Sequence, residues 1–125
     1  MTTLLGSARL AFLIGLAVAA AACNGDPGTP AAATPVDGKL AVELKNFVYV
    51  PKDLSITSGE TVTFSLTSKD IDHTFTVSEL GIDWLVKAGA VRSECVMFNK
   101  AGTFRIICTI PGHEGAGMTG TIQVH

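Results

Sequence analysis

The sequence predicts an all-β domain, a sandwich of about seven to eight short strands. From Lys39 onward, short runs rich in Val, Ile, Phe and Thr alternate apolar with polar residues, which is the period of a half-buried strand. Turn-forming sequences separate these runs, for example Ser58-Gly59-Glu60, Lys87-Ala88-Gly89 and Lys100-Ala101-Gly102. No long helical repeat competes with this pattern.

Seven strands are expected from these runs. In chain order they cover residues 40–44, 54–57, 61–67, 74–78, 93–99, 103–108 and 119–124. The stretch 80–86 around Trp84 is expected to form a loop or a short helix.

Alternation also predicts which side chains point into the core, because successive strand residues face opposite sides of the sheet. Cys108 has the parity of Phe104 and Ile106, and His73 has the parity of Phe75 and Val77. Both His73 and Cys108 are therefore expected to point inward.

The first 22 residues are predicted to be an export signal, with Arg9 as its positive charge and an apolar run after it. The small residues before Cys23 fit either an ordinary signal peptidase site or a lipobox. We favour the lipobox, because a cysteine stands where a lipidated one is needed and a linker follows. The alternative of a membrane-spanning anchor needs roughly 18 or more apolar residues, and the run from 10 to 23 is shorter.

Residues 23–38 are predicted to be a flexible linker rich in Gly, Pro, Ala and Thr, and residues 39–125 the folded domain. The charged fraction of 16% and the net charge of −2 argue against a disordered chain and a nucleic-acid binder. We expect an exported monomer in the periplasm or on the outer face of the cell membrane, held there by lipid on Cys23.

One loop concentrates three metal-binding side chains: Cys108, His113 and Met118 lie in the segment CTIPGHEGAGM. A thiolate, two imidazoles and a weak axial thioether form the donor set that suits copper in electron transfer. His73 is the expected second imidazole, since it lies upstream at a strand edge with inward parity. His125 is expected to be a bystander, because the parity of the last strand places it on the exposed face.

With these residues the sequence resembles the cupredoxins, the small type 1 blue copper proteins. The spacing of Cys108, His113 and Met118 is similar to the ligand loop of auracyanin and rusticyanin, and residues 47–64 with Asp72-His73-Thr74 are similar to the family's N-terminal half. The resemblance covers about residues 40–124. It implies a Greek-key sandwich that binds one copper ion through His73, Cys108, His113 and Met118.

The resemblance also implies a one-electron carrier without catalytic activity, which meets its redox partner proteins transiently. His113 would lie near the surface, beside an apolar patch, while Glu114 could orient a partner. The expected patch residues are Pro111, Gly112, Ala116 and Gly117. Thr74 and Thr109, which follow ligands, are expected either to hydrogen-bond around the site or to turn the loop.

Other functions remain open at this point. A copper storage or delivery protein could use the same ligands, although the chain has only three Met. A catalytic copper enzyme needs further ligands, and a binuclear copper domain needs a second Cys where Gly112 stands. A zinc site and a metal-free adhesion sandwich are further alternatives. Cys95 is expected to be a buried free thiol, since a bridge to Cys108 would abolish the copper site.

Overall fold

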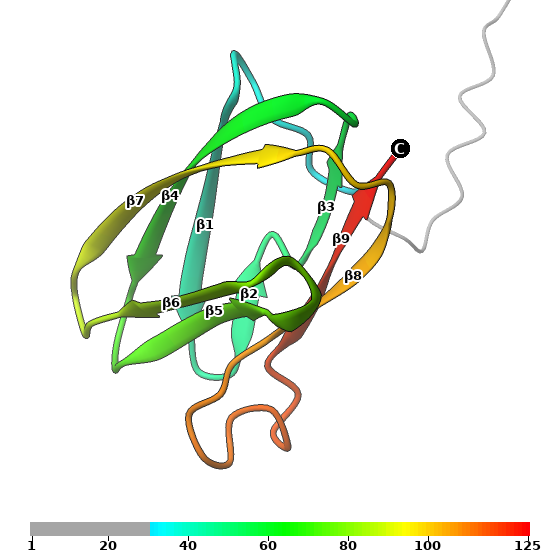
Figure 1. Ribbon diagram of the computed structural model, residues 1–125. Helices are drawn as coiled ribbons and strands as arrows, with labels where there is room; N and C mark the ends of the chain where they lie inside the picture. The colour runs from blue at the N-terminus through cyan, green and yellow to red at the C-terminus, as the bar shows by residue number, and fades with distance from the viewer. Residues whose placement is uncertain (1–30) are drawn as a thin grey trace, which may run out of the picture.

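The alternation of apolar and polar residues produces two β-sheets that pack face to face, seen in the computed structural model of residues 31–125 (Figure 1). The first sheet has the order β2-β1-β4-β7 and the second the order β3-β9-β8-β5-β6. The first sheet contains β1 Lys39–Lys45, β2 Val48–Val50, β4 Glu60–Ser68 and β7 Val91–Phe98. The second contains β3 Asp53–Ile56, β5 His73–Val77, β6 Ile82–Val86, β8 Gly102–Ile107 and β9 Thr119–Val124.

Both sheets are mixed. Strand β1 runs parallel to β4, and β3 runs parallel to β9, while the other neighbours are antiparallel. A short 3₁₀ helix, η1 Ser78–Leu80, connects β5 to β6. The prediction of an all-β sandwich is confirmed, with nine strands in residues 31–125 where seven to eight were expected.

The prediction of a loop or short helix over 80–86 was wrong for most of that stretch. Residues 82–86 form β6, which pairs with β5 so that Trp84 lies opposite Phe75. Ile82 and Val86 are buried, but the exposed face of β6 includes Leu85. An apolar side chain on the outer face hides the period of two, and so the strand was missed.

Strand β2 was missed for the same reason. Its sequence Val-Tyr-Val is wholly apolar, yet only Tyr49 points into the core, whereas Val48 and Val50 are exposed. A run without polar residues carries no alternation from which a face can be predicted.

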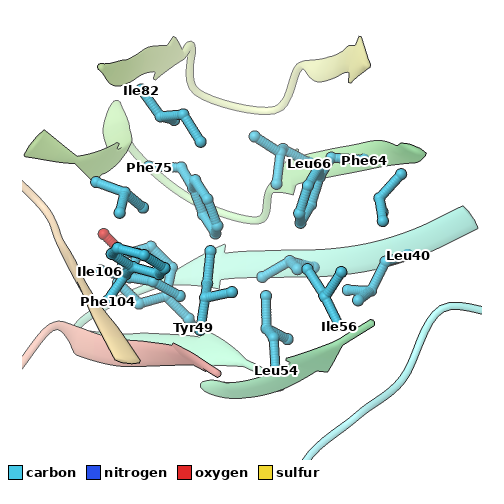
Figure 2. Packing of buried hydrophobic residues seen from close by; sticks show 14 of the residues in the cluster. Leu40, Tyr49, Leu54, Ile56, Phe64, Leu66, Phe75, Ile82, Phe104 and Ile106 are labelled. Carbon is cyan, nitrogen blue, oxygen red and sulfur yellow. The ribbon is translucent and has the colours of Figure 1, made fainter. Parts of the chain in front are cut away.

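Aliphatic and aromatic side chains together fill the space between the sheets (Figure 2). The ring of Phe75 is wholly buried and lies 5.5 Å from Phe64, 5.7 Å from Tyr49 and 5.8 Å from Trp84 between centroids. Burial of this apolar surface is the main force that holds the two sheets together. Phe75 is two residues from the beginning of β5, so the core fixes the strand that carries His73.

The part of the expected linker that the structure describes, 31–38, hydrogen-bonds to the domain. Ala33 forms a bridge with Leu54 of β3, and Val36 forms one with Lys39. The expected signal segment and Cys23 lie outside the described residues. Within 31–125, no helix has the length and apolar character needed to cross a membrane.

Candidate metal centre

Two strands and one loop bring His73, Cys108 and His113 together at one end of the sandwich. His73 is the first residue of β5, and Cys108 directly follows β8 with the inward parity of that strand. Both side chains are wholly buried, and His113 is 7% exposed. The predicted inward orientation of His73 and Cys108 is thus confirmed.

The three donor atoms face one another closely. The Nδ1 atoms of His73 and His113 lie 3.3 Å apart, and Sγ of Cys108 lies 3.4 Å from Nδ1 of His113. All three atoms are within 4.8 Å of one another. Metal–ligand bonds of about 2.0–2.3 Å would place two donors of one ion roughly 3–4 Å apart, so this cluster fits a single metal ion.

The loop between β8 and β9, drawn in orange in Figure 1, carries Cys108, His113 and Met118 and is closed by its own backbone. The amide of Cys108 donates to the carbonyl of Met118 at 3.3 Å, and the amide of Met118 donates to the carbonyl of His113 at 3.0 Å. Gly112 and Gly117 have φ angles of 86° and 99°, which L side chains rarely adopt. Met118 is wholly buried; its role as a fourth ligand stays a prediction.

The sulfur of Cys108 accepts a hydrogen bond from the backbone amide of Thr74, at 3.4 Å. The Thr74 hydroxyl in turn accepts the amide hydrogen of Thr109 at 2.8 Å and lies 3.0 Å from the Thr76 hydroxyl. Thr76 donates to the carboxylate of Asp83 at 2.9 Å. Of the two alternatives expected for Thr74 and Thr109, the structure shows the hydrogen bonds around the site, and Thr76 and Asp83 extend the chain beyond what was expected.

The outer nitrogen of His73 has a partner that was not predicted. Nε2 lies 2.6 Å from Oδ1 of Asp70, three residues earlier in the chain. A carboxylate three residues before a histidine does not by itself predict this contact, because the direction of the Asp70 side chain depends on the turn between β4 and β5.

Two aromatic residues also reach the site, Phe47 from the turn between β1 and β2 and Tyr49 from β2. The ring of Phe47 packs edge-on against His113, with 5.0 Å between centroids. The hydroxyl of Tyr49 donates to the carbonyl of Thr74 at 2.7 Å. Burial, with smaller contributions from the nearby Cys108 and Glu114, raises the pKa of Tyr49 well above its ordinary range, so this hydroxyl stays protonated and can donate.

The residues of the expected surface patch, Pro111, Gly112, Ala116 and Gly117, are all exposed. Glu114 pairs with Arg105 at 2.9 Å. Its negative charge is therefore partly neutralised, and an orienting role for a partner is correspondingly weakened.

The expectation that Cys95 is buried was wrong. Cys95 is exposed on β7, where Glu94 and Val96 take the inward phase and Val96 packs against the core. Cys95 and Cys108 are both free thiols. The imidazole of His125 is exposed and lies 3.4 Å from the Ser55 hydroxyl, outside the metal-binding group, as predicted.

Comparisons with known proteins agree with this geometry. The family model described as copper binding proteins, plastocyanin/azurin family, matches residues 36–125. The chloroplastic plastocyanin of Chlamydomonas reinhardtii is 32% identical over 124 residues, which cover 93% of this chain and 81% of that protein.

A second relative is cytochrome c oxidase subunit 2 of Thermus thermophilus, which is 35% identical over 81 residues. The match covers 62% of this chain, and the chain spans 58% of that relative's length. Among solved structures, auracyanin from Roseiflexus castenholzii has a TM-score of 0.60 at 16% identity, covering 70% of this chain and 97% of that one. At this identity the likeness supports the fold alone.

Proposed function

We propose, from the premise that the chain belongs to the plastocyanin/azurin family of copper binding proteins, that it is a one-electron carrier with a single type 1 copper site. The observation that carries the proposal is the buried cluster of two imidazole nitrogens and one thiol sulfur within 4.8 Å. Copper bound there would accept and release one electron.

His73, Cys108 and His113, with Met118 as a fourth ligand, would hold the copper ion, and this is a donor set that suits copper in electron transfer. Thiolate sulfur favours Cu(I), and imidazole serves both oxidation states, so this set suits a couple that alternates between them. The backbone amide of Thr74 would stabilise negative charge on the Cys108 sulfur. Apolarity and hydrogen bonding around that sulfur are what tune the potential of such sites.

Electron transfer is fast when the donor atoms move little between the two oxidation states. His73 is fixed by β5, whose Phe75 lies in the aromatic core, and Cys108 and His113 are tied to Met118 through backbone hydrogen bonds. These restraints support a carrier, because they keep the ligands in place without help from the metal.

The protein would work outside the cytoplasm, attached by lipid on Cys23 and meeting membrane redox complexes transiently. The predicted export signal supports this location, and a relative named as an oxidase subunit supports the kind of partner. Exposed residues around the loop are small or apolar, and they would let a partner approach His113 closely. They are Phe47 and the patch at 111, 112, 116 and 117.

A visible spectrum of the Cu(II)-loaded protein tests the proposal. Wild type should develop the intense sulfur-to-copper band, and Cys108→Ser should lose it completely. Cys95→Ser is the matched control, because it makes the same change at an exposed thiol, and it should keep the band.

Other outcomes identify the alternatives. A protein that binds Cu(I) tightly but shows no intense band with Cu(II) would be a storage or delivery protein. Binding of zinc in preference to copper, or of no metal, would equally refute the electron-carrier proposal.

A further inference from the structure

We propose that Asp70 is a positioning residue of the metal centre, which orients the His73 ring and uses its negative charge to favour the oxidised metal. This inference rests on the proposed function. Asp70 lies in the turn between β4 and β5, and its side chain is 30% exposed, whereas the His73 ring that it contacts is wholly buried.

Three hydrogen bonds fix the carboxylate of Asp70. Oδ1 lies 2.6 Å from Nε2 of His73 and accepts the Ile71 amide at 2.7 Å, while Oδ2 accepts the Asn46 amide at 2.8 Å. Both oxygens are thus engaged from different chain segments, so the carboxylate cannot rotate freely. Asn46 belongs to the turn between β1 and β2, next to Phe47, which packs on His113.

The contacts of Asp70 favour the charged form of its carboxylate. Both oxygens accept backbone amides, Oδ1 from Ile71 and Oδ2 from Asn46, and hydrogen bonds of this kind stabilise a carboxylate over the protonated acid. The hydrogen bond to His73 is therefore charge-assisted.

The Asp70 carboxylate beside Nε2 decides which nitrogen of His73 can bind a metal. A neutral imidazole has one N–H donor and one acceptor nitrogen. When Nε2–H donates to Asp70, the lone pair lies on Nδ1, the atom that faces His113 and belongs to the donor cluster. Carboxylate partners of this kind fix the tautomer of metal-binding histidines and raise their basicity.

The neighbouring Asp72 makes a contrast. Its carboxylate accepts the Lys87 ammonium at 3.0 Å and the Ala88 amide at 2.8 Å, so its charge is paired with a surface lysine. Among the ion pairs of residues 31–125, Asp70 pairs with His73 and with no Lys or Arg. The charge of Asp70 is therefore directed at the metal centre.

Three variants separate charge from position. Asp70→Asn removes the charge but keeps an oxygen that can accept from Nε2, and Asp70→Ala removes both. Asp72→Asn is the matched control, because it makes the same charge change two residues away on a carboxylate that does not contact a ligand.

The reduction potential and Cu(II) affinity of the copper-loaded proteins form the first measurement. Asp70→Asn should weaken Cu(II) binding about 10-fold, the lower end of the range for such outer partners, with Cu(I) binding little changed. A tenfold change in a one-electron couple corresponds to about 59 mV, and the potential should rise by this amount. Asp72→Asn should change the ratio of the two affinities less than threefold. Equal shifts in the two variants would overturn the proposal.

The second measurement needs no metal. Nitrogen-15 NMR of the apo protein should show His73 with its proton on Nε2 in wild type and in Asp70→Asn, and a mixture of tautomers in Asp70→Ala. A proton on Nδ1 in wild type would overturn the positioning role even if copper binds. Absence of a coloured copper site in wild type, with the tautomers as expected, would refute the proposed function and leave the positioning role of Asp70 standing.

Discussion

Replacement of Thr74 by Val should loosen the beginning of the ligand loop while leaving every donor atom in place. The Thr74 hydroxyl accepts the Thr109 amide hydrogen at 2.8 Å and lies 3.0 Å from the hydroxyls of Thr109 and Thr76. Valine has a similar shape but no hydroxyl, so the substitution removes the side-chain hydrogen bond between the strand that carries His73 and Thr109, the residue after Cys108. The backbone amide of residue 74, which donates to the Cys108 sulfur, is retained.

The expected cost in free energy of unfolding follows from the partners that are left behind. A typical hydrogen bond contributes about 0.5–1.5 kcal/mol, and an orphaned buried group costs about 1–3 kcal/mol. Thr74 is 7% exposed, whereas Thr109 is an exposed residue, and the hydrogen bond between them is part-buried. We therefore expect the apo protein to lose about 1–2 kcal/mol.

Thr76→Val is the matched control for this experiment. Thr76 is 5% exposed and bonds to Asp83 and Thr74 but not to the loop. Its loss should cost about as much stability, about 1 kcal/mol, yet leave the copper site unchanged. Urea unfolding of the apo proteins measures the first quantity, and the position of the sulfur-to-copper band with the rate of copper release measures the second.

Only Thr74→Val should shift the band and speed copper release several-fold, because of the two threonines only Thr74 hydrogen-bonds to the loop. If both variants lose similar stability and both release copper at the wild-type rate, the hydrogen bond from Thr109 to Thr74 does not position the site, and the reasoning fails.

The remaining predictions concern the core and the acid limit. Phe75→Ala should cost about 3–5 kcal/mol of unfolding free energy, since the ring is wholly buried against Tyr49 and Phe64. The control Met97→Ala, at a side chain that is 61% exposed, should change the free energy of unfolding by no more than about 0.5 kcal/mol. Equal losses for the two variants in urea unfolding would contradict the packing. The pKa of Asp70 lies at about 2 in the folded protein, below its unfolded value of about 3.9, so its contribution to apo stability is present above about pH 4 and lost as the pH falls through about 2. Asp70→Asn should flatten that part of a stability curve measured by urea unfolding from pH 2 to 6, and an unchanged slope would refute the effect.

The parts of the fold that could be predicted are those in which local alternation and burial agree. In β8, Phe104 and Ile106 are buried and Arg105 between them is exposed, so the inward direction of Cys108 followed from parity alone. Strands β2 and β6 could not be found this way, because Val48 and Leu85 are apolar and yet exposed. The prediction that Cys95 is buried was wrong for a related reason. Both faces of β7 carry apolar residues, and packing against β4 decides which face points inward.

In the candidate site, too, some residues could be predicted from the sequence and others could not. Donor types and their spacing lie within one segment, so Cys108 and His113 could be recognised, and His73 followed from its parity. The partners of the donors depend on tertiary structure. Asp70 is only three residues from His73, but its carboxylate is directed by the amide of Asn46, which belongs to a different turn. No local pattern contains that amide, and the sequence could not assign the role.

The backbone of the ligand loop bears on how all ligand variants should be interpreted. The bonds that join Cys108 to Met118 and Met118 to His113 run between main-chain groups, and the tight turns fall at Gly112 and Gly117. A side-chain substitution at Cys108 removes a donor but none of these bonds, so the loop should keep its path. Loss of colour in Cys108→Ser would therefore report lost chemistry at the sulfur. If the same variant instead showed the amide exchange of an unfolded loop, the side-chain contacts of the thiol, and not the backbone, would be what holds the loop together.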